Sequence, residues 1–258
     1  MRIQLLSDLH IEHFDYKDEL DELLESCLTN ADVLILAGDI GVPGSLGGYD
    51  FWFHTMEFFC SNYPEIIYVP GNHEYYHSYW NRITNLLNEI KQPNLHIFED
   101  MGSITLDETT FHCGTGWFVE ANPMDALHWN RMSDAHVIFN QNMNERMALQ
   151  TFWDKGKAAS KYLLKNVNKG DIVVTHHMPH KACTPPQFST SKMNNFFVNK
   201  AFEQVIIKNQ PKLHLFGHTH NNYDSVIKNT RTVCNPLGYW KYEIKANEEF
   251  NRQLIIEI

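Results

Sequence analysis

Five short apolar runs are the feature of this chain that most restricts its fold. Each run ends at polar, glycine or proline residues, which is typical of a buried β-strand. The runs are Ile3–Leu6, Val33–Ala37, Ile66–Val69, Ile172–Thr175 and Leu213–Phe216. Strands that are apolar on both faces lie in sheets covered on both sides, so we expect an α/β protein.

Segments with helical spacing separate the first three runs and follow the third. Apolar residues recur at helical intervals from Leu20 to Leu28, and the segments Phe51–Cys60 and Tyr79–Ile90 have the same character. This pattern predicts a βαβαβα opening. Asn142–Val167 is long enough to predict a substantial helix before the Ile172 run.

Two groups of short apolar segments predict further strands. The first group is Leu95–Phe98, Ile104–Leu106 and Thr110–Cys113, whose close spacing favours antiparallel strands added to a parallel half. The second group is Ser225–Ile227, Thr230–Cys234 and Leu254–Ile256. Because no repeat or flexible linker divides the 258 residues, we expect one domain covering residues 1–258.

The composition excludes several classes of protein. A formal charge of −10 argues against the basic surface that long nucleic acids require, but it is compatible with a small anionic substrate. Five cysteines without a CxxC pair predict neither a disulfide framework nor a thiolate zinc site. Asp8 interrupts the N-terminal apolar run too early for a signal peptide, and no run approaches ~18 residues. We therefore expect a cytoplasmic protein without a membrane partner.

Side chains that bind metal ions follow all five runs. In open α/β sheets, functional groups collect where the strands end at their carboxyl edge. The residues at these ends are Asp8 and His10, Asp39, Asn72 and His73, His176 and His177, and His218 and His220. Pairs two residues apart point the same way if the backbone stays extended, because the strand period is two. We expect these side chains to converge.

The two-residue period of a strand also distinguishes His176 from His177, since adjacent side chains of an extended segment point to opposite faces. We take His176, nearer the strand end, as the candidate ligand, and keep His177 as the alternative. Glycines at 38, 71 and 217 precede three of the ligand positions, where the missing Cβ allows the backbone to turn sharply.

Mixed carboxylate, amide and imidazole ligands suit Mn²⁺, Fe or Zn²⁺, of which we expect Mn²⁺. An all-oxygen Mg²⁺ site would not need this many histidines. The set of candidate ligands exceeds what one ion ordinarily takes: it is Asp8, His10, Asp39, Asn72, His176, His218 and His220. Two ions ~3.5–4 Å apart, bridged by one carboxylate, would use it naturally.

The order of these motifs resembles that of the calcineurin-like metallophosphoesterases. The five are DxH at Asp8, GD at Asp39, GNH at Asn72, a histidine at His176 and GHxH at His218. Together they span most of the chain, and the full set is highly specific. The resemblance implies a four-layer α/β/β/α sandwich of two mixed sheets flanked by helices. It also implies a metal-dependent phosphoric ester hydrolase.

The resemblance further implies a role for each residue. Asp8, His10 and His220 would hold one metal ion, and Asn72, His176 and His218 would hold the other. Asp39 would bridge the two ions, and His73 would be the catalytic acid near the scissile bond. Glu74 departs from the aspartate that many members carry. Asn235–Tyr239 is similar to a non-catalytic segment of some bacterial members.

The implied chemistry follows from charge. Two divalent ions bring about +4 against −2 from Asp8 and Asp39, so the centre should attract a phosphate oxyanion. Metal binding lowers the pKa of water towards ~7, and the resulting metal-bridging hydroxide would attack phosphorus in line. His73 would give a proton to the leaving alkoxide.

The function expected first is hydrolysis of a phosphate mono- or diester, or a pyrophosphate bond, in a small phosphorylated substrate. The alternatives are a nuclease of the same family and a non-catalytic scaffold that binds protein partners. The loops 115–131 and 178–195 are expected either to contact substrate or to be plain surface segments. The substrate and the oligomeric state are left open. Structural roles are expected for six histidines that do not lie with other candidate ligands at a strand end, which are His54, His96, His112, His136, His180 and His214.

Overall fold

The computed structural model describes residues 1–45, 47–120 and 122–258. A first sheet contains the early predicted strands and has the order β13-β1-β2-β3-β5. Its strands are β1 (Arg2–Leu6), β2 (Val33–Leu36), β3 (Glu65–Tyr68), β5 (Leu95–Ile97) and β13 (Ile255–Glu257). All neighbours in it are parallel except β13, which is antiparallel to β1.

A second sheet has the order β11-β12-β10-β9-β7-β6. Its strands are β6 (Gly102–Leu106), β7 (Thr109–Gly114), β9 (Ile172–Thr175), β10 (Leu213–Phe216), β11 (Tyr223–Ile227) and β12 (Thr230–Cys234). The four inner strands run parallel, and β6 and β11 close the two edges as antiparallel strands. A short parallel pair, β4 (Ser78–Tyr79) with β8 (Ile138–Phe139), lies apart from both sheets.

The two sheets bury one face against each other, and strand alternation explains how. Val33 and Ile35 of β2 pack in the same apolar cluster as Ile172 and Val174 of β9. Leu34, which lies between them and points to the opposite face of β2, packs instead with the helices that cover the first sheet. Each fully buried branched side chain stabilises the fold by about 1.5–3 kcal/mol, so both faces contribute to the core.

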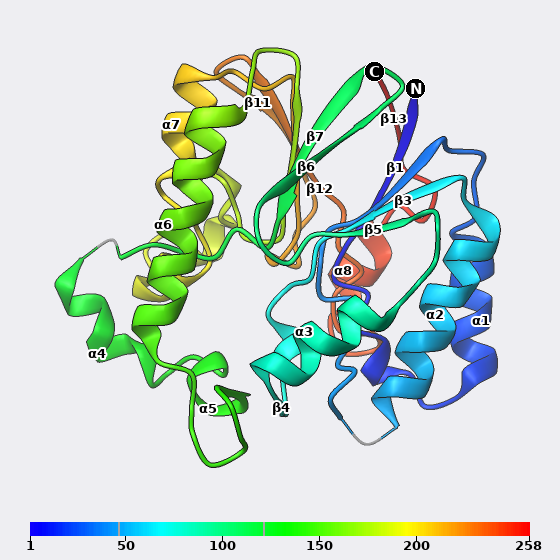
Figure 1. The fold of residues 1–258 in the computed structure, drawn as a ribbon, viewed down its shortest axis with the longest axis horizontal. Coiled ribbons are helices and arrows are strands. Elements are labelled where there is room, and N and C mark those ends of the chain that lie inside the picture. Colours follow the sequence, from blue (N-terminus) through cyan, green and yellow to red (C-terminus); the bar gives the residue numbers. More distant parts are fainter. Residues whose placement is uncertain (46, 121) are drawn as a thin grey trace.

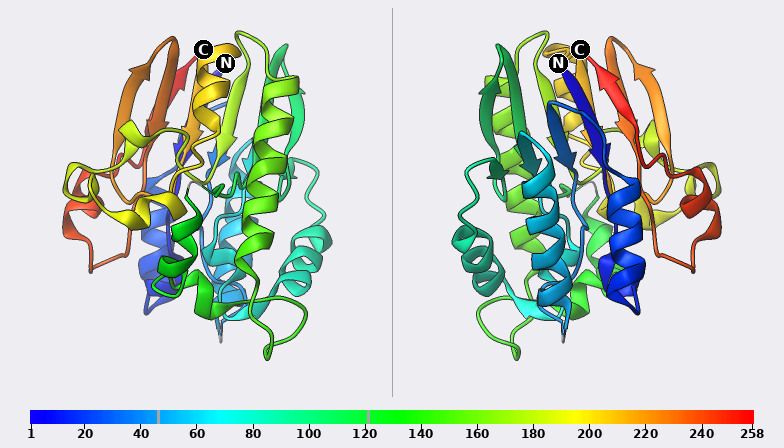
Figure 2. Two further views of the ribbon diagram at one scale, coloured as in Figure 1. Left: turned by 90° about the vertical axis from the view of Figure 1, so that its left-hand side faces the viewer. Right: turned by 90° about the vertical axis from the view of Figure 1, so that its right-hand side faces the viewer.

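Helices cover the outer face of each sheet (Figures 1 and 2). α1 (Lys17–Ser26) and α2 (Gly48–Asn62) cover the first sheet, and α6 (Leu149–Asn166) and α7 (Phe202–Lys208) cover the second. The remaining helices are α3 (Trp80–Glu89), α4 (Ala126–Trp129), α5 (Asp134–Val137) and α8 (Ile244–Glu249). The predicted four-layer α/β/β/α sandwich is confirmed. Within the described residues, no helix has the length and apolar character needed to cross a membrane.

Three predictions about elements were wrong in detail. β5 is parallel to β3, not antiparallel, because α3 returns the chain to the start of the sheet before β5 begins. β13 does not join the second group of strands but pairs with the free edge of β1. α6 begins at Leu149, not at Asn142, because Ala148 is extended and the residues before it form a turn with β8.

Candidate metal centre

The carboxyl ends of the inner strands of both sheets meet at one place. After β1 and β2, the backbone N–H of Asp8 donates to the carbonyl of Gly38 over 2.9 Å, and that of His10 to Asp39 over 3.1 Å. After β9 and β10, the N–H of Gly217 donates to the carbonyl of His176 over 3.0 Å. The N–H of His218 then donates to the Asp8 carboxylate over 2.8 Å, which joins the two sheets at the site.

Left-handed backbone conformations, and not extended ones, make the side chains converge. Positive φ angles occur at Asp8 (51°), His10 (45°), Asp39 (52°), His218 (74°) and His220 (44°). The expectation of a locally extended backbone at the two i, i+2 pairs was therefore wrong. Such conformations are costly for residues with a Cβ and cluster at functional sites, where the surrounding structure holds them.

The predicted crowding at the glycines is present. A Cβ on Gly38, whose φ is +88°, would collide with the His176 ring, and one on Gly71 would collide with the Asp39 carboxylate. Both positions therefore need glycine for the ligand side chains to approach the backbone.

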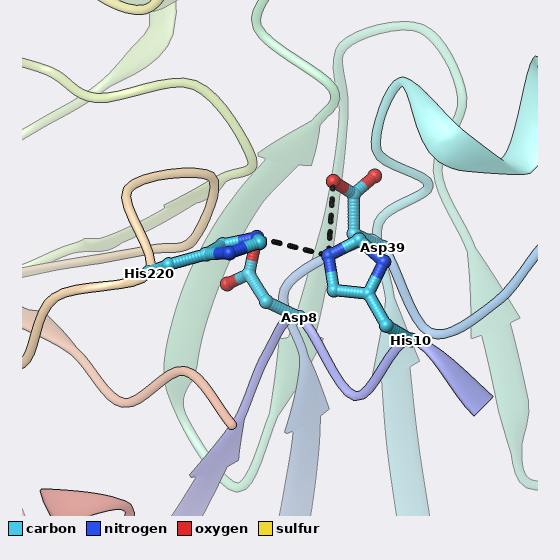
Figure 3. A group of neighbouring side chains, drawn as sticks. All are labelled: Asp8, His10, Asp39 and His220. Atoms are coloured by element: carbon cyan, nitrogen blue, oxygen red, sulfur yellow. Dashed lines mark hydrogen bonds and ion pairs between the residues drawn. The ribbon is translucent and has the colours of Figure 1, made fainter. Parts of the chain in front are cut away.

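The first group of candidate ligands is Asp8, His10, Asp39 and His220, whose ligand atoms all lie within 4.8 Å of one another (Figure 3). Nδ1 of His10 faces Glu12 at 3.0 Å, and Nδ1 of His220 faces Glu243 at 2.5 Å. Each carboxylate accepts a hydrogen bond from an Nδ1–H group, so the neutral rings point unprotonated Nε2 atoms at each other, 2.9 Å apart. Two facing lone pairs need a cation between them.

A second group, Asp39, His176 and His218, has the same character and the same 4.8 Å limit. Nδ1 of His176 lies 2.9 Å from the carbonyl oxygen of Ala37, which can only accept, so Nδ1 carries the proton. Nε2 faces Nδ1 of His218 at 3.0 Å and a carboxylate oxygen of Asp39 at 3.2 Å. Burial opposes protonation, but Asp39 raises the pKa of His176 to about 9, so Nε2 carries a proton at the place that a metal ion would take.

Asn72 adds an oxygen ligand to this second group. Its Nδ2 donates to Asp134 over 2.9 Å and to the hydroxyl of Tyr76 over 3.0 Å, which fixes the orientation of the amide. Its Oδ1 consequently points towards Nε2 of His176, at 3.1 Å. Either a proton on Nε2 of His176 or a metal ion must therefore lie between these two atoms.

Asp39 lies between the two groups. One oxygen, Oδ2, lies 3.9 Å from Nε2 of His10 and 3.2 Å from Nε2 of His176. Burial alone would raise the pKa of Asp39, but the facing His176 and His73 hold the pKa of this carboxyl well below its ordinary value. An ionised carboxylate shared by both groups is the arrangement that a bridging ligand requires.

The donor chemistry fits two transition-metal ions. Oδ2 of Asp8 is fully buried and has no hydrogen-bond partner among the described residues. A buried carboxylate oxygen without a partner is costly unless it binds a cation. Imidazole nitrogens and carboxylate oxygens without sulfur suit Mn²⁺, Fe or Zn²⁺, as the sequence predicted.

His176 and His177 differ clearly. His177 packs against Trp117 and Phe118, with ring centroids 5.0 and 5.8 Å away, and neither group of ligand atoms includes it. Burial, followed by the neighbouring His176, lowers its pKa well below the ordinary value. The structure thus places His176 in the cluster and His177 in the aromatic core beside it.

His73 lies at the edge of the cluster. Its backbone N–H donates to Asp39 over 2.8 Å, Nδ1 lies 3.4 Å from Glu12, and Nε2 lies 3.5 Å from the hydroxyl of Tyr239. Its ring stacks on Tyr76 at 4.0 Å. Burial opposes protonation, yet the negative charges of Asp39 and Glu12 raise the pKa of His73 to about 9. Although His10, Glu12 and His73 also lie close together, His10 and Glu12 satisfy each other by hydrogen bonding.

Glu74 is a backbone anchor. Its buried carboxylate accepts hydrogen bonds from the N–H groups of Gly71 (2.7 Å), Asp39 (3.1 Å) and Ile40 (2.7 Å), and from the hydroxyl of Tyr68 (2.7 Å). It therefore ties the loop after β2 to the loop after β3. The longer glutamate side chain reaches both loops at once.

Residues 235–239 also contribute to the site. The N–H groups of Leu237 and Gly238 donate to the carbonyls of Ser7 and Asp8 over 3.1 and 3.0 Å. The Tyr239 ring packs edge-on against the rings of His10 and His220, 4.6 and 4.7 Å away. This segment supports the first motif loop and places a tyrosine beside His73.

Sequence reasoning missed the residues that orient the ligands. Glu12, Glu243 and Asp134 hold His10, His220 and Asn72 in place. Glu12 continues the two-residue spacing of the first motif and could have been found from that signal. Nothing near Asp134 or Glu243 in the sequence indicates their role, because both reach the site only through tertiary packing.

The six histidines expected to be structural have partners away from the cluster. Their partners are Asp21 for His54, Glu65 for His96, Asp171 for His112, Asn130 for His136, Glu203 for His180 and Thr175 for His214. In the loop 115–131, residue 121 lies outside the described residues.

Comparisons with known proteins identify the family of this chain. A sequence profile of the family described as calcineurin-like phosphoesterase matches residues 1–222. An uncharacterised protein of Acanthamoeba polyphaga mimivirus is 28% identical over 272 residues, covering 93% of this chain and 92% of the relative. Residues 223–258, beyond the matched range, add β11, β12 and β13 to the two sheets.

Solved structures share the fold. A phosphopantetheinyl hydrolase of Mycobacterium tuberculosis superposes with a TM-score of 0.71 at 15% identity, covering 94% of this chain and 91% of that one. A dimetal phosphatase of Danio rerio superposes with a TM-score of 0.57 at 12% identity, covering 93% and 88%. The chain belongs to the calcineurin-like phosphoesterase family.

Proposed function

We propose that this protein is a phosphoesterase that depends on two divalent metal ions. The observation that carries the proposal is that two groups of candidate metal ligands share Asp39. Asp8, His10 and His220 would hold one ion, Asn72, His176 and His218 the other, and Asp39 both. Mn²⁺ is the proposed metal, with Fe or Zn²⁺ as alternatives.

When bound, the two ions supply positive charge for the phosphate oxygens and lower the pKa of water towards ~7. The protein's own contribution is orientation. Glu12 and Glu243 fix the tautomers of His10 and His220, and Asp134 fixes the amide of Asn72. Such supporting hydrogen bonds hold ligands in their binding geometry before the ions arrive.

His73 supplies the proton. In the metal-free protein, Asp39 and Glu12 raise the pKa of His73 to about 9 against the effect of burial, and Glu12 would still favour the imidazolium form once Asp39 holds the ions. His73 lines a cavity of about 270 Å³ together with Asn72, His218, His220 and Tyr239. From there His73 can protonate the leaving oxygen of a phosphate ester bound in the cavity.

The proposed substrate is a small phosphate mono- or diester, or a small pyrophosphate. The two solved neighbours described above carry the names of a hydrolase and a phosphatase, which supports hydrolysis as the reaction class. A nuclease remains the second candidate, disfavoured by the net charge of −10. A scaffold is the third, disfavoured because it would not need a complete ligand set.

A substrate panel tests the proposal. Purified protein loaded with Mn²⁺ is assayed on 4-nitrophenyl phosphate, bis(4-nitrophenyl) phosphate, a nucleoside pyrophosphate, a cyclic nucleotide and single-stranded DNA. Metal-dependent hydrolysis of at least one small ester, and little of DNA, is the expected result. Inactivity on all five with both ions bound would favour the scaffold.

A further inference from the structure

A second cavity of about 360 Å³ opens beside the candidate metal centre. Arg131 to Ser133 and residues between Thr184 and Phe197 line it. These residues belong to the loops 115–131 and 178–195 or border them. The second loop is built from short 3-10 turns at Lys181–Cys183, Pro186–Phe188 and Lys192–Phe196.

The two cavities are adjacent. Met132, Ser133, Phe188, Phe197 and Thr219 line both of them. The Phe197 ring stacks on the ring of the candidate ligand His218, with centroids 4.6 Å apart and planes 28° from parallel. The organic group of a phosphate ester bound in the first cavity would therefore lie next to the second.

The walls of the second cavity suit a flat apolar group. Met132, Met178 and Met193 line it together with Phe188 and Phe197. Thioethers pack well against aromatic rings, and unbranched methionine side chains adapt to different shapes. Phe188 is 54% exposed, which is a large exposed fraction for an aromatic side chain that faces a cavity. Covering it with a flat ring would remove apolar surface from water.

The charge of this cavity is opposite to that of the protein. Among the described residues that line it, Arg131 carries the one full charge and no carboxylate is present. Arg131 is exposed and forms no ion pair within the described parts of the chain, although the whole protein carries −10. A free guanidinium beside apolar walls is complementary to an anionic group on an otherwise apolar molecule.

We propose that the second cavity binds the organic part of the substrate, and that this part is a flat aromatic group carrying a second anion. The scissile phosphate would lie at the metal centre, the ring between Phe188 and the methionines, and the anion at Arg131. This inference rests on the proposed function and names the substrate class of the same site.

A binding experiment tests the cavity without hydrolysis. The probe is 2-naphthoate, which has the ring and the anion but no phosphate, titrated into zinc-loaded protein and followed by NMR. A ligand of this size should bind the wild type with a Kd of about 1 mM. Arg131→Ala and Phe188→Ala should each weaken binding about tenfold. The matched controls Arg82→Ala and Tyr16→Ala, both at exposed positions elsewhere, should leave it unchanged.

Equal binding by all five proteins would overturn the proposal, since the naphthoate carboxylate would then be held elsewhere, for example at the metal ions. Both test residues are exposed at the surface, so neither substitution removes a core side chain. A circular dichroism melt confirms that each variant is folded before its affinity is compared.

A kinetic experiment tests the same assignment during turnover. The substrates are 2-naphthyl phosphate and its analogue with a carboxylate at ring position 6. Arg131→Ala should lower kcat/KM about tenfold on the carboxylate ester, through KM, and by less than twofold on the plain ester. Phe188→Ala should lower kcat/KM on both esters. Equal losses for Arg131→Ala on both esters would contradict an anion site.

The two proposals fail in different ways. If the wild type hydrolyses no ester although both metal ions are bound, the proposed phosphoesterase function is wrong, while 2-naphthoate binding still decides whether the cavity takes an aromatic anion. If hydrolysis occurs but neither variant changes binding or KM, the function stands and the substrate class is wrong.

Discussion

The Nε2 atoms of His10 and His220 lie 2.9 Å apart, and the Nδ1–H group of each ring donates a hydrogen bond to a glutamate. Glu12 and Glu243 therefore determine that both inward nitrogens are free to bind a metal ion. The two histidines come from opposite ends of the chain and from different sheets. This relationship connects the fold directly to metal affinity.

Removing either glutamate should lower metal affinity. Glu12→Ala and Glu243→Ala free the Nδ1 atoms of His10 and His220, so the rings lose their fixed tautomer and orientation. We expect Mn²⁺ affinity to fall about 10–100-fold in each, measured by calorimetric titration. Glu12→Gln, which keeps an acceptor oxygen, should recover part of the loss. Glu22→Ala, an exposed control on α1, should bind Mn²⁺ like the wild type. Unchanged Mn²⁺ affinity in Glu12→Ala would refute the orienting role of Glu12.

His73→Ala should keep both metal ions but lose its ability to protonate a leaving group. Removing a general acid costs about 10²–10⁴ in rate when the leaving group is poor. An alkyl phosphate should therefore suffer far more than 4-nitrophenyl phosphate, whose phenolate leaves without protonation. Comparing kcat for the two esters measures the difference. The same fractional loss on both would rule out the acid role.

Glu74 should be a large contributor to stability. Glu74→Ala leaves the N–H groups of Gly71, Asp39 and Ile40 buried without their acceptor. We expect the free energy of unfolding to fall by about 3–5 kcal/mol, and by about 1–3 kcal/mol in Glu74→Gln, which keeps one acceptor oxygen. Urea unfolding of metal-free protein measures both without a contribution from bound ions. A change below about 0.5 kcal/mol in Glu74→Ala would show that the anchoring role is wrong.

His214 should make stability depend on pH. It is buried on β10, and burial lowers its pKa from 6.5 to about 3. Between these values the unfolded chain binds a proton that the folded protein excludes. The free energy of unfolding should therefore be highest above pH 6.5 and fall as the pH drops towards 3, with a slope of up to about 1.4 kcal/mol per pH unit from this residue.

His214→Gln tests this assignment because glutamine can still donate to Thr175 but does not titrate. Urea unfolding of metal-free protein at several pH values should give a shallower slope for the variant than for the wild type in that window. Parallel curves for the two proteins would show that His214 does not carry the dependence.

The fold and the candidate ligands could largely be predicted from the sequence because both depend on local signals. Short apolar runs such as Val33–Ala37 form strands wherever they are covered on both faces, and Asp39 follows at the strand end by chain continuity. The register of β13 could not be predicted in this way. Its partner β1 lies at the other end of the chain, and pairing with a free edge depends on tertiary closure.

The fine structure of the site was less predictable for a related reason. The left-handed conformations at Asp8 and His218 arise because hydrogen bonds between loops hold these residues there, against their intrinsic preference. Asp134 supports Asn72 across 62 positions of sequence, with no motif around it. Local patterns indicate which residues bind metals, but not which residues hold them in position.

Two ions that share the Asp39 carboxylate should be lost or weakened together when Asp39 changes. Calorimetric titration of metal-free protein with Mn²⁺ measures this, with Asp39→Asn as the comparison. We expect two ions per chain in the wild type and no more than one in Asp39→Asn. A folded wild type that binds one ion or none, or an Asp39→Asn variant that binds two with unchanged affinity, would contradict it.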